Sequence, residues 1–335
     1  MADLLSEGDL LEGRYCRYQI LKRLGNRNDE AGSTPDPTPT TINHRLAQLR
    51  PETYRAQDRR TGESVIIKAV HYHAWELIEN EWRALDRLLW WARLNPLTPR
   101  IAPILKRGLE YDETNDIFFI VFEYIDDDWL NLGEFVKHFG GLMDSGREHA
   151  VHEMRQLRNA FVRAIRLLHW TGIVHGDNKD EHIFLKKVRI NGEERLSFNH
   201  IKIIDFGGCY MRGPENWKGG SLGFSSPYFW HPGHRRSLTR RELEAIDWYG
   251  MCATLYYAYT GECFPAASPA HSSLSGENKL YYPKLKEILK GKLWGRSDEE
   301  RHLIGEVIEC LCSSNPISIA PQMSKIINPP WFGGR

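Results

Sequence analysis

The feature that most constrains the fold is the concentration of strand-type patterns in the first 125 residues of this 335-residue chain. Weak alternation of polar and apolar residues predicts a strand at 15–24. The Thr61-Gly62 turn, flanked by β-branched residues, predicts a hairpin over 53–68, and the apolar run at 118–125 predicts a buried strand. Short strands separated by turn residues indicate a β-rich N-terminal part.

Helix-type patterns dominate the remainder of the chain. Apolar residues spaced three and four apart predict one helix at about 74–91, within the N-terminal part, and another at 155–170. The patterns beyond Asp247 are mainly helical. This order, strands first and helices afterwards, predicts an α+β fold with a small β-rich lobe and a larger helical lobe.

The local composition of the chain indicates where its parts begin and end. Residues 26–51 are rich in Pro and Thr, which prevents strand pairing and predicts an irregular, exposed insertion. We therefore divide the chain into an N-terminal extension at 1–14, a β-rich lobe at 15–125 that carries the insertion, and a helical lobe at 126–335.

Charge and cysteine content narrow the functional class. Lys plus Arg and Asp plus Glu both number 44, so the zero net charge gives no reason to expect nucleic acid or a membrane surface as the main partner. The chain starts without a secretory signal pattern, and no apolar run is long enough to span a bilayer. The six cysteines show no C-x-x-C spacing. Reduced thiols and a cytoplasmic location are therefore expected.

The first candidate functional residue is Lys68, which ends the β-branched run Val65-Ile-Ile-Lys68. Glu81 lies on the face of the predicted 74–91 helix that presents Ala84 to the core. An inward carboxylate is costly in free energy unless it meets a cation. We therefore expect an ion pair between Lys68 and Glu81.

Two further segments carry acidic residues at strand and loop junctions. His175-Gly-Asp177 follows an apolar stretch and precedes the apolar segment at 183–185. Ile201-Lys-Ile-Ile-Asp205-Phe-Gly207 places an aspartate at the end of a predicted strand, 28 residues after Asp177. Each segment alone is a weak signal, but their order and spacing together are specific.

Together the three segments resemble the V-A-I-K, H-R-D and D-F-G motifs of the eukaryotic-type protein kinase family, over about residues 15–330. The resemblance implies that Lys68, oriented by Glu81, binds the α- and β-phosphates of ATP. It implies that Asp177 orients the acceptor hydroxyl, that Lys179 neutralises the γ-phosphate and that Asp205 holds Mg²⁺.

The resemblance extends to the nucleotide base and the large lobe. Residues 122–125 match the hinge between lobes, with Phe122 as gatekeeper and the backbone of Glu123 and Ile125 facing adenine. Asp247 matches an aspartate that anchors the catalytic loop and has a structural role. The implied cofactors are ATP and Mg²⁺ or Mn²⁺.

The sequence departs from the family pattern at the phosphate and metal positions. Gly25 is the one glycine of the expected G-x-G-x-x-G loop, so the backbone cradle for the phosphates is incomplete. His182 replaces the asparagine that binds the second metal. Magnesium prefers oxygen ligands, so His182 either binds a metal, favouring Mn²⁺, or hydrogen-bonds within its loop and leaves one metal on Asp205.

Two departures concern regulation and the large lobe. Gly176 replaces the arginine of H-R-D, so switching by phosphorylation in the usual form is not expected. Gly233 and Ile319 replace the two partners of a buried salt bridge, and losing both leaves no charge unpaired.

The leading prediction is a divergent Ser/Thr-type kinase that acts on a protein or small-molecule acceptor. One alternative is a pseudokinase scaffold. The other is a kinase fold adapted to nucleotidyl or aminoacyl transfer, with which a tRNA substrate is compatible. The sequence indicates no oligomeric state.

Overall fold

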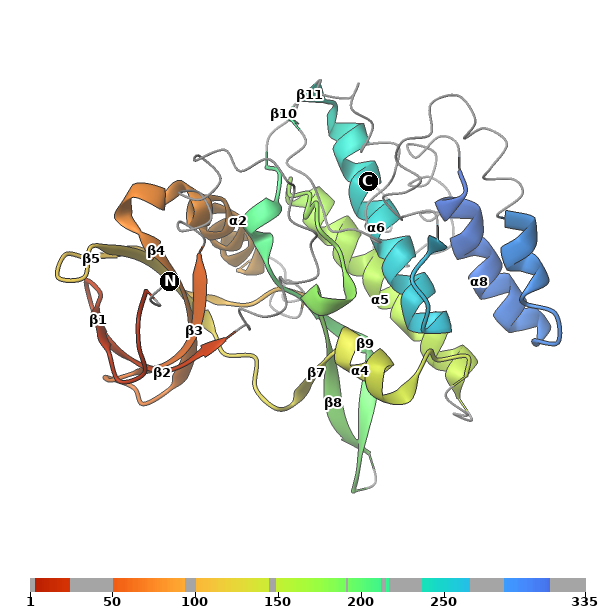
Figure 1. Ribbon diagram of the computed structural model, residues 1–335, viewed down its shortest axis with the longest axis horizontal. Helices are drawn as coiled ribbons and strands as arrows, with labels where there is room; N and C mark the ends of the chain where they lie inside the picture. Colours follow the sequence, from red (N-terminus) through yellow and green to blue (C-terminus); the bar gives the residue numbers. More distant parts are fainter. Residues whose placement is uncertain are drawn as a thin grey trace, which may run out of the picture. The chain divides into compact units, whose positions relative to one another are not determined.

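The computed structural model describes residues 4–24, 51–93, 101–144, 149–190, 192–211, 215–216, 237–265 and 286–313 (Figure 1). The chain divides into two compact units, Met1–Asp126 and Asp127–Arg335, and each is described by itself. The division falls between Asp126 and Asp127, one residue beyond the predicted hinge at 122–125. All but Pro51 of the predicted insertion lies outside the described residues.

The first unit is built on a six-stranded antiparallel sheet with the strand order β1-β2-β3-β4-β6-β5. Its strands are β1 (Leu10–Glu12), β2 (Arg17–Leu24), β3 (Glu52–Asp58), β4 (Ser64–His71), β5 (Leu105–Asp112) and β6 (Ile117–Glu123). Alternate side chains of these strands form one buried cluster that includes Tyr18, Tyr54, Ile67 and Phe119. The predicted strands and the hairpin at 53–68 are confirmed.

Residues before β2 are part of this sheet, which the sequence did not indicate. β1 pairs with β2 on one side. On its other side, Glu12 N donates to Asp112 Oδ2 at 2.9 Å, and Arg14 N donates to Glu110 Oε2 at 2.9 Å. Acidic side chains of β5 thus accept hydrogen bonds from the backbone N–H groups of Glu12 and Arg14 and close the sheet. Gly13 suits this position, because a Cβ here would lie 1.8 Å from Glu110 Oε2 and would displace the Glu110 carboxylate.

The helix of this unit, α2 (Glu76–Ala92), follows β4 through the 3₁₀ turn η2 (Tyr72–Ala74). It packs against β4, β5 and β6 (Figure 1). Its buried face carries Ile78, Glu81, Ala84, Leu85 and Leu88 at helical spacing. The helix and the inward direction of Glu81 are therefore confirmed.

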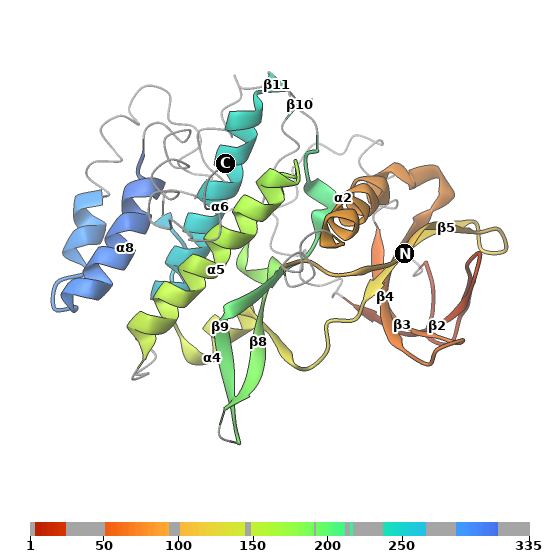
Figure 2. The same cartoon turned by 180° about the vertical axis from the view of Figure 1, so that it is seen from behind.

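The second unit is mainly helical. Its helices are α4 (Leu132–Phe139), α5 (Ala150–Trp170), α6 (Arg240–Thr260) and α8 (Asp298–Leu311). The central pair, α5 and α6, lies side by side in both views (Figures 1 and 2). Capping boxes fix the starts of two helices, Thr239 with Glu242 at α6 and Ser297 with Glu300 at α8.

A three-stranded sheet, β7-β8-β9, precedes α6 in the chain. Its strands are β7 (Trp129–Asn131), β8 (Ile183–Ile190) and β9 (Glu193–Ile203). The predicted strand at 201–204 covers only the end of β9. The pairing of β9 with β8 extends from Ile203, opposite Ile183, to Glu193, opposite Ile190. A short pair, β10 (Glu215–Asn216) and β11 (Ser237–Leu238), lies before α6. None of the described helices is long and apolar enough to cross a bilayer.

Candidate functional site

Lys68 and Glu81 form the predicted ion pair in the first unit. Lys68 Nζ lies 2.6 Å from Glu81 Oε2, and the two side chains are 14% and 3% exposed. Lys68 is held on the central strand β4, whose neighbours are β3 and β6. A carboxylate buried as deeply as that of Glu81 is costly in free energy unless a cation lies beside it. The ion pair with Lys68 therefore fixes α2 to the sheet with this face inward.

The hinge residues lie at the end of β6. Phe122 is buried, and Glu123 N donates to Ile104 O at 2.9 Å. The Glu123 N–H is therefore already bonded within this unit. Ile125 follows the strand in an irregular segment, and its peptide group is not part of the β4–β6 ladder.

In the second unit, the buried carboxylate of Asp247 organises the loop that contains His175-Gly-Asp177. Its oxygens accept hydrogen bonds from His175 N at 2.8 Å, Gly176 N at 2.7 Å and Asn178 Nδ2 at 2.9 Å. His169 Nε2 lies 2.9 Å from Asp247 Oδ2. Asp247 sits within α6, so these bonds hold the His-Gly-Asp turn on a rigid helix. The anchoring role expected of Asp247 is confirmed.

Gly176 has a structural reason to replace arginine. Its φ is +83°, in the left-handed region that favours glycine. A Cβ here would lie 2.8 Å from the Tyr210 ring and 3.1 Å from Gly208 O. Tyr210 is fixed in place because its backbone exchanges two 2.8 Å hydrogen bonds with Val174.

Asp177, His182 and Asp205 converge at the end of this loop. His182 Nδ1 lies 2.9 Å from Asp177 O and 3.7 Å from Asp177 Oδ2, while His182 Nε2 lies 3.4 Å from Asp205 Oδ2. The Asp177 and Asp205 side chains are 25% and 42% exposed, whereas that of His182 is 9% exposed. Two accessible carboxylates therefore flank one buried imidazole.

The hydrogen bonds assign the state of His182. A carbonyl oxygen can only accept, so Nδ1 carries the hydrogen that is donated to Asp177 O. The pKa of His182 is lowered, because burial disfavours the cation more than the carboxylates of Asp205 and Asp177 stabilise it. A neutral imidazole with a protonated Nδ1 presents a lone pair at Nε2, toward Asp205.

These residues fit a divalent cation. A carboxylate oxygen and an imidazole lone pair 3.4 Å apart are close enough to bind one ion. No group of three His, Cys, Asp or Glu side chains in the described part of the chain is arranged to hold a metal alone. Oxygen atoms of a nucleotide and water would have to complete the coordination.

The Asp-Phe-Gly segment is held in an uncommon backbone conformation. Asp205 has a φ of +62°, rare for a residue other than glycine, and begins the 3₁₀ turn η4 (Phe206–Gly208). Phe206 is fully buried, and its ring lies 4.9 Å from that of His175. His175 Nε2 in turn donates to Ile204 O at 2.9 Å. Such conformations persist where surrounding contacts fix them, as at functional sites.

Lys179 forms an ion pair with its neighbour Glu181. Lys179 Nζ lies 3.1 Å from Glu181 Oε2, and the Glu181 side chain is 62% exposed. A surface pair of this kind contributes little stability and is readily exchanged for a stronger anion such as a phosphate.

Some functional contacts were not anticipated from the sequence. The Asn131 side chain accepts from Gly133 N and Glu134 N at the start of α4 and donates to Glu181 O at 2.7 Å. It thereby links α4 to the 3₁₀ turn η3 (Asp180–His182). The asparagine before an apolar helical run is a capping signal that could have located α4, but nothing local indicates the bond to Glu181.

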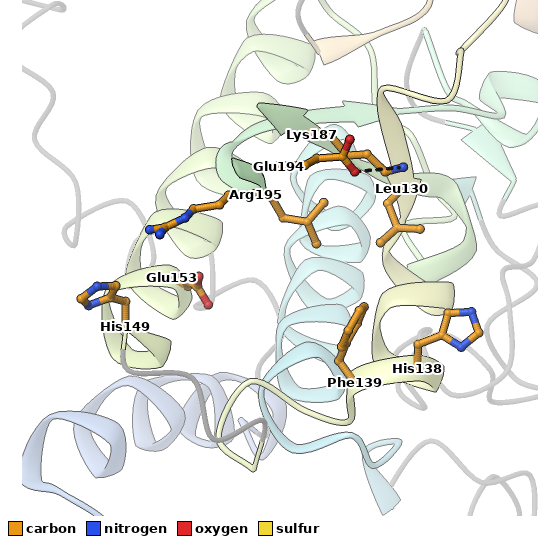
Figure 3. Close-up of a pocket in the computed structure, with 9 residues that line it drawn as sticks. Leu130, His138, Phe139, His149, Glu153, Lys187, Glu194 and Arg195 are labelled. Carbon is orange, nitrogen blue, oxygen red and sulfur yellow. Dashed lines mark ion pairs between the residues drawn. The ribbon is translucent and has the colours of Figure 1, made fainter. Parts of the chain in front are cut away.

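A cavity of about 600 Å³ lies elsewhere in this unit, between the β8–β9 hairpin and the ends of α4 and α5 (Figure 3). Its lining residues include Phe139, His149 and the paired Lys187 and Glu194, which are 3.6 Å apart at their charged atoms. None of the predicted site residues lines it. Predictions for Gly25, Gly233 and Ile319 concern positions outside the described residues.

Comparison with known proteins bears on the family and the fold. A curated relative, a probable serine/threonine-protein kinase of Streptomyces coelicolor, is 27% identical over 156 residues, which are 47% of this chain and 20% of that protein. The chain thus matches only a fifth of that relative's length. The crystal structure of the PF14_0431 kinase domain has a TM-score of 0.60 at 13% identity, over 97% of this chain and 96% of that one. This likeness shows the fold.

The family model described as the protein kinase domain matches residues 51–332. The matched segment contains Lys68, Asp177 and Asp205 as well as the Asp247 anchor. The chain belongs to the protein kinase family.

Proposed function

We propose that this chain transfers the γ-phosphoryl group of ATP to a serine or threonine hydroxyl of a protein substrate. The observation that carries the proposal is the arrangement of Asp177 and Asp205 around His182, on a loop anchored by Asp247. The printed name of the Streptomyces relative supports the Ser/Thr acceptor.

Each residue has a role in this proposal. Asp177 accepts or orients the acceptor hydroxyl proton, and Lys179 leaves Glu181 to stabilise charge on the γ-phosphate. Lys68, oriented by Glu81, binds the α- and β-phosphates. A bound divalent cation would neutralise negative charge that develops on the phosphates, and Asp205 with His182 Nε2 would hold it.

The adenine contacts assigned to Phe122, Glu123 and Ile125 and the phosphate contact assigned to Gly25 are also part of the proposal. ATP and Mg²⁺ or Mn²⁺ are the cofactors it requires, and the cytoplasm is the location it favours.

A nucleotide-binding pseudokinase is the second candidate. It is favoured by the Lys179–Glu181 pair and by the imidazole in place of a second metal-binding amide. In that case the chain would bind ATP and act through a partner. Lys68, Glu81, Asp177 and Asp205 are all retained, however, and the loss of catalysis would remove selection for them.

The experiment compares wild type with Asp177→Asn and Asp205→Asn, using ATP labelled at the γ-phosphate, generic protein acceptors, and Mg²⁺ or Mn²⁺. Asp177→Asn should preserve nucleotide affinity and lower turnover by about three orders of magnitude. Asp205→Asn should remove metal-dependent nucleotide affinity. Asp144→Asn, at an exposed position of the same unit, is the control.

The outcomes separate the candidates. ATP binding without transfer in wild type would support the pseudokinase. A modified acceptor whose added mass, measured by mass spectrometry, corresponds to a nucleotidyl or aminoacyl group would support other transfer chemistry. Turnover unchanged in Asp177→Asn would contradict the kinase assignment.

A further inference from the structure

Three arginine side chains gather on the first unit around the Tyr15–Cys16 segment. Arg14 Cζ lies 5.3 Å and Arg107 Cζ 6.0 Å from the centre of the Tyr15 ring. Arg60 Nε lies 3.5 Å from Cys16 Sγ, and the Arg107 guanidinium also neighbours this sulfur. The three cations come from the β1–β2 link, the β3–β4 turn and β5, so the closed sheet brings them together.

The charges of this cluster, defined as Arg14, Arg60 and Arg107, are incompletely balanced. Among the described residues, none of the three makes an ion pair within 4.0 Å. Arg60 and Arg107 are close enough to repel each other. Like charges held together without paired carboxylates are stabilised by an anion between them.

The nearest carboxylates, Asp58 and Glu110, attract Arg60 and Arg107 without forming ion pairs within 4.0 Å, and their oxygens accept hydrogen bonds from other donors. Asp58 accepts from Arg60 N at 2.8 Å, from Thr61 N at 3.1 Å and from the Cys16 thiol. Glu110 accepts from Arg14 N. Both carboxylates are buried, whereas Arg14 and Arg60 are exposed. The outward-facing part of the cluster is therefore cationic.

Further groups suit a phosphate ligand. The Tyr18 hydroxyl is buried and neighbours the Arg107 guanidinium, so it supports that side chain and does not itself reach a ligand. The Tyr15 ring, on a residue 63% exposed, offers an apolar face beside the guanidinium groups. Guanidinium groups bind phosphate oxygens through paired N–H donors.

The surroundings indicate a compact anion rather than an extended polyanion. The neighbouring cations Arg17 and Lys106 are paired with the exposed carboxylates of Glu12 and Glu63. A nucleic-acid strand or an anionic membrane would meet these carboxylates as it continued past the site. A single dianionic group would not.

We propose that Arg14, Arg60 and Arg107 form a binding site for a phosphate monoester, carried on a phosphorylated serine, threonine or tyrosine side chain of a protein segment. Tyr15 contacts the segment beside the phosphate. Binding of a phosphorylated protein at this site does not depend on phosphoryl transfer. The proposal therefore does not require the chain to be an active kinase.

The test measures binding to the full-length chain in the absence of ATP. The probe is a fluorescein-labelled peptide of neutral residues with one phosphoserine, read by fluorescence anisotropy beside its unphosphorylated twin. Arg60→Gln and Arg107→Gln should each weaken binding of the phosphopeptide by about tenfold, the loss expected for one charge-assisted hydrogen bond.

Arg59→Gln is the matched control. Arg59 is the residue before Arg60 and has the same charge, but its guanidinium donates to Gln19 Oε1 at 2.7 Å. Its substitution should change the affinity by less than about twofold. Circular dichroism checks folding, and because Arg60 is exposed, Arg60→Gln keeps the test valid even if Arg107→Gln unfolds the protein.

Competition identifies the source of the phosphate. Displacement by free O-phosphoserine or inorganic phosphate at concentrations similar to that of the phosphopeptide would overturn the assignment to a protein segment. Much weaker displacement would support it. Equal binding of the two peptides, equal effects of Arg59→Gln and Arg60→Gln, or tighter binding of single-stranded RNA or of phosphatidylserine vesicles would overturn the proposal.

Discussion

The His182 imidazole donates Nδ1–H to the carbonyl oxygen of Asp177, and this bond directs Nε2 toward the carboxylate of Asp205. The sequence left two alternatives for His182, a metal ligand or a residue bonded within its loop. The geometry joins them, because the loop bond leaves the second nitrogen available to a cation. Asp177 thereby orients the His182 imidazole through its backbone.

We predict that His182→Asn changes the metal preference. With His182, nucleotide affinity should be higher with Mn²⁺ than with Mg²⁺, because imidazole is a poor ligand for magnesium. With asparagine, the preference should move toward Mg²⁺ by about tenfold or more. Titration of a fluorescent ATP analogue with each metal measures this. An identical metal preference in both proteins would show that Nε2 binds no cation.

Lys68→Met should destabilise the protein by about 3 kcal/mol, because it leaves the buried carboxylate of Glu81 without its cation. The double variant Lys68→Met/Glu81→Leu should recover part of this loss. Urea unfolding curves give the free energies. The control is Arg83→Met, which removes an exposed pair with Glu79 on the same helix and should cost about 0.5 kcal/mol or less. Equal costs for Lys68→Met and Arg83→Met would contradict a stabilising role for the buried pair.

Gly176→Ala should be more destabilising than Gly192→Ala. Both glycines have φ above +80°, so alanine costs about 1 kcal/mol at each from backbone strain. A Cβ at Gly192 meets no atom within 4 Å, whereas one at Gly176 meets the Tyr210 ring. The added cost at Gly176 should be about 1–3 kcal/mol, measured by thermal unfolding. Gly176→Arg, which restores the arginine of the family motif, should destabilise the protein for the same reason.

Glu110 should make stability depend on pH. Burial raises its pKa, although the Arg14 N–H and the Arg107 charge oppose this. Because the folded pKa is above the unfolded one, its contribution is fully present below about pH 4.3 and is lost as pH rises through the folded pKa. Glu110→Gln should therefore be more stable than wild type at pH 7 and similar to it at pH 4. Melting temperatures measured across this pH range test the prediction, with the exposed Glu113→Gln as control. Parallel changes in wild type and Glu110→Gln would contradict it.

The structural features that depend on neighbouring residues, or on two segments with clear patterns, were predicted well from the sequence. The Lys68–Glu81 pair followed from a strand-end lysine and one helix face, and the Asp247 anchor followed from the family resemblance. The β8–β9 hairpin was underestimated, because the residues between 186 and 195 are mostly charged. The Asn191-Gly192 dipeptide, which lies between the paired residues Ile190 and Glu193, is a strong hairpin signal that could have identified it.

Contacts between distant segments were beyond local patterns. Residues 12–14 contact Glu110 and Asp112 of β5, which lie about a hundred positions later in the chain. The short apolar stretch that contains Leu10 and Leu11 does not specify that partner. His182 and Asp205 were each predicted as metal ligands, but the single hydrogen bond that orients the imidazole depends on the fold of the whole loop.

The closure of the first sheet has a consequence for any shortened form of this protein. The family match begins at residue 51, after both β1 and β2. A chain starting there would expose β3 as an edge strand, with backbone donors and acceptors that β2 satisfies in the intact sheet. Such an edge recruits strands from other molecules. Shortening to the recognised family segment should therefore produce aggregation, even though every residue assigned to phosphoryl transfer except Gly25 would remain.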